Sequence, residues 1–87
     1  MRLAERIEAW AAENPLRRWR LRQSLSQLNL SSLIGVSTKS IGLWENGAAT
    51  PSDDHFDALA TATGRTPSGL RYAWAAWIKQ RPSAATE

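Results

Sequence analysis

Apolar residues recur along the chain at the spacing of a helix. Near the start, Leu3, Ile7 and Trp10 stand at i, i+4 and i+7, which places all three on one helical face. The same spacing returns between residues 70 and 78. No segment keeps the strict alternation of apolar and polar residues that is typical of a half-buried strand. The pattern therefore predicts an all-α protein.

Residues that suit helix ends divide this pattern into six short helices. Asn14 and Thr66 each stand before a proline, which combines an N-cap side chain with a fixed φ at the first helical position. Gly35 and Gly64 can adopt the left-handed conformation that commonly ends a helix. We expect helices over residues 3–13, 15–24, 27–34, 38–46, 53–63 and 67–81, with a frayed tail over 82–87.

Length and composition bound this picture without specifying it. The 87 residues allow one small domain, with a core over 14–69, an N-terminal helix over 1–13 and a C-terminal helix over 70–81. The absence of cysteine excludes a disulfide framework, a thiolate metal site and a cysteine nucleophile. No apolar run approaches the roughly 18 residues of a membrane span, and no signal peptide opens the chain. We therefore expect a soluble, cytoplasmic protein with no membrane partner.

Positive charge is concentrated in the middle of the chain. The whole sequence has a net charge of +3, from 11 lysines and arginines against 8 acidic residues. Residues 14–52 carry all of Arg17, Arg18, Arg20, Arg22 and Lys39 against a single glutamate, whereas residues 53–69 are net acidic. A basic block of this kind favours a polyanionic partner, although charge alone is weak evidence.

The expected helices over 27–34 and 38–46 are separated by only three residues, Gly35-Val36-Ser37. A turn this short forces the two helices to cross steeply, as in a helix-turn-helix, because an ordinary antiparallel hairpin needs a longer connection. The second helix of such a pair can be presented at the surface, where the major groove of DNA is wide enough to accept it. This spacing is the first specific indication of duplex DNA as the partner.

A longer motif extends over the turn. It reads Leu25-Ser26-Gln27-x-x-Leu30-x-x-x-x-Gly35-Val36-Ser37-x-x-x-Ile41-x-x-Trp44-Glu45-x-Gly47-x-x-x-Pro51 and continues through Leu59-Ala60 and Gly64-Arg65-Thr66-Pro67. In residue types and spacing, this segment resembles the Cro/lambda-repressor type (XRE-like) helix-turn-helix family, over roughly residues 15–68. The resemblance implies a compact five-helix DNA-binding domain, here with an extra N-terminal helix and an extended C-terminal helix. It also implies binding to operator DNA, usually as a dimer.

The resemblance implies DNA contacts for residues on and around the second helix of the motif. Gln27 would contact phosphate and brace this recognition helix, and Lys39, its only cation, would bind guanine or phosphate. Leu43 would pack on a thymine methyl group or stay solvated, and Arg18 and Arg22 would touch phosphates or only solvate the surface. The full DNA-binding set is Arg18, Arg22, Gln27, Ser37, Thr38, Lys39, Ser40, Gly42, Leu43 and Asn46.

Other polar residues suggest structure rather than chemistry. Arg20 and Glu45 match a pair that forms a salt bridge in the family, so we expect them to link the second and fourth helices. His55 follows two aspartates in the first turn of one helix, where a solvated helix start explains it better than a metal site. We find no catalytic constellation, and we predict neither enzymatic activity nor a cofactor.

The terminal helices are too apolar to remain in water on a domain this small. Their stripes either pack on each other and on the core, or build a dimer. We favour a homodimer, because two-fold dimers are common and operators are often palindromic. The leading interface candidates are Trp74, Trp77 and Ile78.

Two functional hypotheses follow from the sequence. The first is a sequence-specific regulator of transcription that binds double-stranded DNA, most simply a repressor of phage or mobile-element type. The alternative is an antitoxin or adaptor-type interaction module that binds a protein partner through its terminal helices.

Overall fold

Six helices form the fold in a computed structural model, which describes residues 2–83. They are α1 (Leu3–Ala12), α2 (Pro15–Arg22), α3 (Gln27–Ile34), α4 (Thr38–Glu45), α5 (Asp53–Thr63) and α6 (Pro67–Lys79), with no strand in this part of the chain. The prediction of an all-α protein is confirmed. Of the expected tail over 82–87, residues 84–87 lie outside the described residues.

The predicted caps determine where the helices begin. Asn14 accepts a hydrogen bond from the backbone N–H of Arg17, 2.9 Å, and the equivalent side-chain caps of α3, α4, α5 and α6 are also formed. One boundary differs from expectation: α2 ends at Arg22 instead of near residue 24. The reason is that Ser24 adopts a φ of 57°, which turns the chain out of the helix toward α3.

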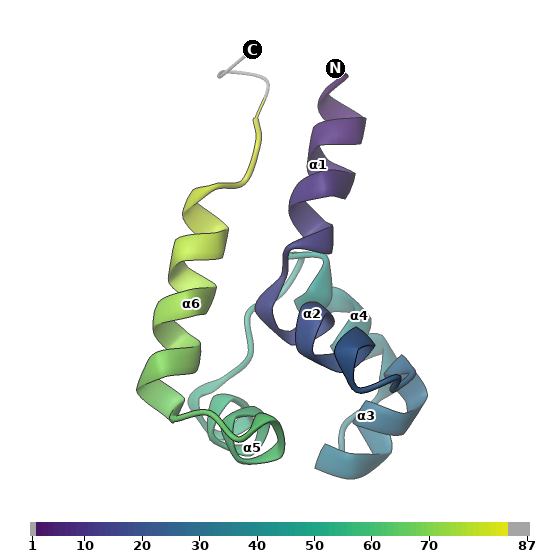
Figure 1. Ribbon diagram of the computed structural model, residues 1–87, viewed down its shortest axis with the longest axis vertical. Coiled ribbons are helices and arrows are strands. Elements are labelled where there is room, and N and C mark those ends of the chain that lie inside the picture. Colours follow the sequence, from purple (N-terminus) through teal and green to yellow (C-terminus); the bar gives the residue numbers. More distant parts are fainter. Residues whose placement is uncertain (1, 84–87) are drawn as a thin grey trace.

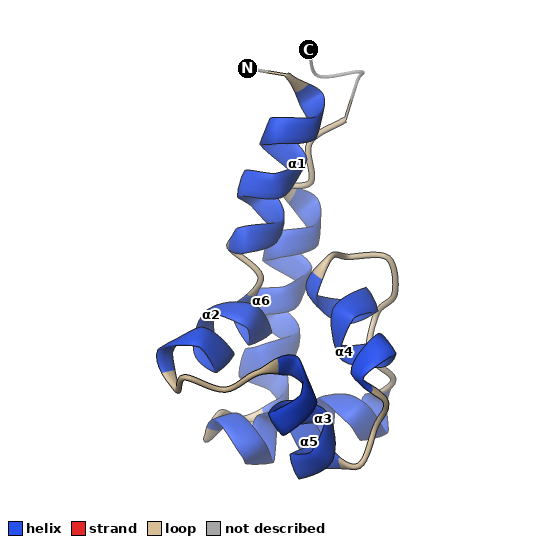
Figure 2. Ribbon diagram, turned by 90° about the vertical axis from the view of Figure 1, so that its right-hand side faces the viewer, coloured by secondary structure: helices blue, strands red, loops and turns tan. Residues whose placement is uncertain are grey.

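The helices form a body with two projecting ends. In Figure 1, α2 to α5 make up the lower part of the molecule, and α1 and the C-terminal half of α6 extend upward from it. The described ends of the chain therefore lie at the same end of a shape that measures 38 × 25 × 20 Å. In the view of Figure 2, α4 lies at the right edge of the body and α2 at the left. Thr38 and Lys39 of α4 are exposed.

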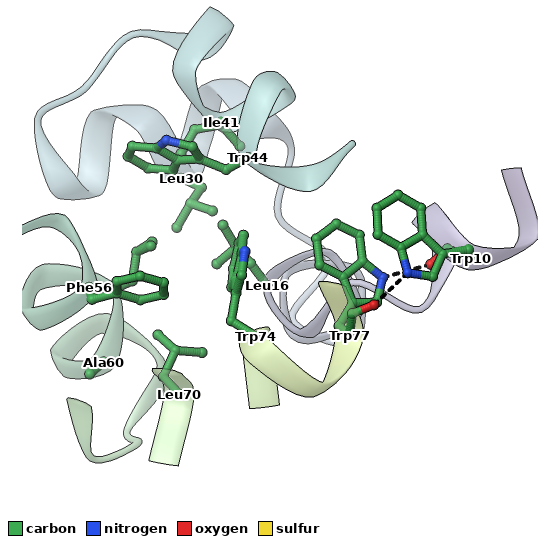
Figure 3. Packing of buried hydrophobic residues seen from close by; sticks show 11 residues of the cluster. Trp10, Leu16, Leu30, Ile41, Trp44, Phe56, Ala60, Leu70, Trp74 and Trp77 are labelled. Atoms are coloured by element: carbon green, nitrogen blue, oxygen red, sulfur yellow. Dashed lines mark hydrogen bonds between the residues drawn. The ribbon is translucent and has the colours of Figure 1, made fainter. Parts of the chain in front are cut away.

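The buried side chains form one continuous core. It combines residues of the helix-turn-helix segment with tryptophans from both terminal helices (Figure 3). The indole of Trp74 packs edge-on against Phe56, with ring centroids 5.5 Å apart. The core comprises Trp10, Leu16, Leu30, Ile41, Trp44, Phe56, Leu59, Ala60, Leu70, Trp74 and Trp77.

This packing corrects the expectation for the dimer interface. Trp74 and Trp77 were named as interface candidates, but they are only 2% and 4% exposed because they fill the core of their own chain. Of the three interface candidates, Ile78 alone remains available, at 36% exposure. The apolar stripe of α6 is therefore used within one chain, which was the other possibility that the sequence left open.

Candidate nucleic-acid interface

The turn between α3 and α4 presents α4 at the surface. Gly35 ends α3 with a φ of 73°, and Ser37 caps α4 two residues later. The inner side of α4 buries Ile41, Trp44 and Glu45 against the rest of the domain. Its other side chains face solvent fully or in part: Thr38, Lys39, Ser40 and Leu43, with the backbone of Gly42 between them. The predicted division of this helix into two faces is thus present.

An ion pair joins α4 to α2. Arg20 donates from Nε and Nη2 to the two carboxylate oxygens of Glu45, at 2.8 and 2.9 Å, and from Nη1 to the carbonyl oxygen of Leu25, 2.8 Å. Both side chains are buried, so the two-point geometry orients α4 about its axis. The hydrogen bond with Glu45 raises the pKa of Arg20 and outweighs the opposite effect of burial. The salt bridge expected between these two residues is formed.

Gln27 extends this network to the surface. Its Nε2 donates to Oε1 of Glu45, 3.1 Å, while its side chain lies next to Gly42 of α4. A methyl group at position 42 would meet Gln27 at an ordinary van der Waals distance of 3.8 Å, so steric fit does not require glycine there. Gln27 stands in the first turn of α3, where backbone N–H groups and the helix dipole favour an anion.

Local hydrogen bonds hold the polar residues at the start of α4. Ser37 Oγ accepts from the backbone N–H of Ser40, 3.1 Å, and the two hydroxyls are 2.9 Å apart. Thr38 Oγ1 lies 3.2 Å from the hydroxyl oxygen of Ser31 in α3. These three side chains are therefore positioned by local contacts before any ligand arrives. Lys39 is exposed and makes no side-chain contact of this kind with residues 2–83.

The loop after α4 begins with Asn46. Its Oδ1 accepts from the backbone N–H of Ala48, 2.9 Å, which fixes the side chain while its amide nitrogen stays available as a donor. Asn46 is exposed. It lies at the C-terminal end of α4, and Gln27 lies across the same helix against Gly42, so polar donors border the exposed face of α4 at two places.

Arg18 and Arg22, expected either to touch phosphates or only to solvate the surface, lie on a different side of α2 from Arg20. Each is two positions from Arg20 along α2, which is more than half a helical turn, and Arg20 points to α4. Arg18 instead pairs with Glu13 at 3.0 Å. Together with Arg65 the two arginines line a cavity of about 220 Å³ between α2 and α6. Sequence alone placed them on a shared face but gave no direction for that face.

His55 has a structural role that the sequence analysis did not identify. Its Nδ1 lies 2.9 Å from the hydroxyl of Ser52, and its ring packs on Trp44 with centroids 5.0 Å apart. The imidazole thus supports the buried side of α4 from the start of α5. Within residues 2–83, no group of His, Cys, Asp or Glu side chains is arranged to hold a metal ion.

Comparison with protein families identifies this arrangement. A helix-turn-helix family model matches residues 16–70, which is more than half of the chain. The protein therefore belongs to the helix-turn-helix family of the Cro/lambda-repressor type, and it is a DNA-binding regulator. No curated protein and no solved structure matches it. No helix in the described part of the chain has the length and apolarity needed to cross a membrane.

Proposed function

We propose that the protein is a sequence-specific regulator of transcription that inserts α4 into the major groove of double-stranded DNA. The observation that carries this proposal is the fixed orientation of α4. Arg20, Glu45 and Gln27 hold its inner side, and Thr38 and Lys39 face outward. A helix locked in this way presents the same side chains to every base pair it meets, which sequence-specific readout requires.

Each exposed residue of α4 has a distinct role in this proposal. Lys39 binds the major-groove acceptors of guanine or a nearby phosphate, and Thr38 donates or accepts at a base edge. Leu43 packs on a thymine methyl group, while Gly42 lets the backbone approach the groove closely. Gln27 and Asn46 bind phosphates on either side, and Ser37 and Ser40 support the first turn of the helix.

We further propose that the regulator acts as a repressor and as a homodimer. Repression by blocking a promoter needs nothing beyond tight occupancy of the operator. A two-fold dimer would place two copies of α4 about 34 Å apart on a palindromic site. The interface would use residues still exposed on one chain, with Ile78 as the remaining candidate of the original three.

The alternative, an adaptor that captures a protein partner through its terminal tryptophans, has less support. Trp10, Trp74 and Trp77 are all buried within the chain, so none is available to an incoming partner. What this alternative retains is a set of exposed apolar residues on other helices, such as Leu28 and Leu33 on α3.

Selection of bound duplexes from a random pool tests the proposal. We expect the purified protein to enrich a palindromic sequence, with an affinity that falls steeply as salt increases. Lys39→Ala should change the enriched bases, whereas Glu8→Ala, an exposed position on α1, should leave them unchanged. Enrichment of no common sequence would contradict the proposed function, and an enriched site without two-fold symmetry would contradict the dimer.

A further inference from the structure

Two contacts bring the residues after α6 to the loop that follows the recognition helix. Arg81 donates from Nη1 to the carbonyl oxygen of Gly47, 3.4 Å. Its guanidinium also lies over the ring of Trp10, with Cζ 5.3 Å from the centroid. Arg81 is outside the segment 16–70 that defines the family. The C-terminal extension therefore places a cation beside the end of α4.

The contact depends on the backbone at Gly47. This residue has a φ of 78°, and a Cβ atom here would lie 2.5 Å from Cη2 of Trp10 and 3.3 Å from Cη2 of Trp77. Only glycine allows the loop to pack this closely on the two indoles. The carbonyl of Gly47 is thereby held where Arg81 reaches it, and Trp10 supports the flat side of the guanidinium.

The end of α4 lacks a positive charge of its own. The helix has no basic residue in its last turn, and residues 46–52 include neither lysine nor arginine. The exposed carbonyls at a helix C-terminus carry a partial negative charge, which disfavours an approaching phosphate. Arg81 supplies the opposite charge at this place, although it is 34 residues away from Gly47 in the chain.

We propose that Arg81 forms a binding site for a backbone phosphate of the DNA duplex, beside Asn46 at the C-terminal end of α4. The guanidinium has five donors in a fixed fork, and the bond to Gly47 uses one of them. Within residues 2–83, no carboxylate pairs with Arg81, and its side chain is exposed. This site rests on the proposed function, because it assumes that α4 lies in the groove.

The chain offers a matched control for this site. Lys79 is two residues from Arg81 and is also exposed, but its side chain makes no hydrogen bond, ion pair or ring contact within residues 2–83. Arg81→Ala and Lys79→Ala remove the same charge from the same end of the protein. Only the first removes it from the loop after α4.

The experiment measures how affinity for the selected duplex depends on salt, by fluorescence anisotropy with the full chain. The slope of log Kobs against log salt is negative. Loss of one phosphate contact makes it less steep by about 0.9 for each bound subunit. We expect this decrease for Arg81→Ala, the wild-type slope for Lys79→Ala, and most of the slope restored in Arg81→Lys.

Two outcomes would overturn this site while leaving the proposed function intact. One is an equal slope for Arg81→Ala and Lys79→Ala. The other is a weaker affinity for Arg81→Ala at an unchanged slope, which would assign Arg81 to the packing of Trp10 alone. If the wild-type protein enriches no sequence, the proposed function itself fails, and the three variants are then compared on one fixed duplex to judge the phosphate site separately.

Discussion

Trp10 and Trp77 are joined by two reciprocal hydrogen bonds, each from an indole side chain to the other residue's backbone. The indole N–H of Trp10 donates to the carbonyl oxygen of Trp77, 2.6 Å, and the indole N–H of Trp77 donates to the carbonyl oxygen of Trp10, 2.8 Å. The rings stack with centroids 4.1 Å apart and planes 2° from parallel (Figure 3). This Trp10–Trp77 pair joins the two terminal helices, α1 and α6, to each other outside the family segment 16–70.

Replacing either indole of the pair should destabilise the fold. Trp10→Phe removes the indole donor and part of a buried ring, while the carbonyl of Trp77 keeps its bond from the backbone N–H of Gln80. The lost hydrogen bond and buried volume should lower the free energy of unfolding by about 1–3 kcal/mol. The double variant with Trp77→Phe should lose less than the sum of the single losses, because the residues act as a unit. Urea denaturation followed by circular dichroism measures both. Trp19→Phe is the control, since the indole of Trp19 makes no hydrogen bond within residues 2–83, and an equal loss there would contradict this account.

Two glycines with similar backbones should respond differently to substitution. Gly35 and Gly47 have φ values of 73° and 78°, so alanine pays the left-handed conformational penalty at both, about 1 kcal/mol. A Cβ at Gly35 meets nothing within 4 Å, whereas one at Gly47 collides with Trp10. We therefore expect Gly47→Ala to shift the urea midpoint at least twice as far as Gly35→Ala. Similar shifts would mean that the loop and the indole separate at little cost.

The ion pair between Arg20 and Glu45 should behave as a buried network. Removing one partner leaves a buried charge unpaired, so Arg20→Ala and Glu45→Ala should each cost about 3–5 kcal/mol. Replacing both with residues of similar size, as in Arg20→Met with Glu45→Leu, should cost much less than the sum of the single changes. Thermal denaturation of the four proteins decides this. Additive losses would indicate independent contributions.

The stability that Arg20 contributes through this pair should not change as the pH rises from about 7 to about 10. The pKa of Arg20 is raised by its hydrogen bond to Glu45, so its folded-state pKa lies above the unfolded one. A group shifted in this direction stabilises the fold fully below its unfolded pKa and loses that stabilisation only as the pH rises through the folded pKa. The stability difference between wild type and Arg20→Met should therefore stay constant from about pH 7 to about pH 10. A difference that shrinks over this interval would contradict the assignment.

Substitutions at Lys39 and Arg22 should distinguish a direct DNA contact from a general effect of positive charge. Lys39 is exposed on α4, while Arg22 lines the cavity on the other side of α2. Lys39→Ala should weaken binding to the selected duplex by about tenfold or more, because a base or phosphate contact is lost. Arg22→Ala should change the affinity by less than about twofold, since Arg22 lines the cavity between α2 and α6 and an exposed charge that makes no direct contact with the DNA is largely screened by salt. Anisotropy titrations measure both, and comparable losses would place α2 against the DNA.

The features that could be predicted from the sequence are those that depend on neighbouring residues, such as the helix starts. Asn14 and Thr66 each cap a backbone N–H three residues further along, so these helix starts could be predicted from the local sequence. The salt bridge between Arg20 and Glu45 was predicted because both residues match positions of the family motif. Long-range packing was not predictable in the same way: the stripe of α6 showed that Trp77 avoids water, but nothing in the pattern named Trp10 as its partner. Arg18 and Arg22 show the same limit, because helical periodicity defines a shared face without defining its neighbour.

The Trp10–Trp77 pair also bears on the order in which the chain folds. Its hydrogen bonds join residues 67 positions apart in a chain of 87, so forming them closes most of the chain into a loop. The contacts between α3 and α4 are local and require far less ordering, so they can form early. We expect changes at Trp10 to accelerate unfolding and to leave the refolding rate nearly unchanged. The stacking of the two indoles would then be the final step of folding, in which α1 and α6 pack together after the DNA-binding helices have formed.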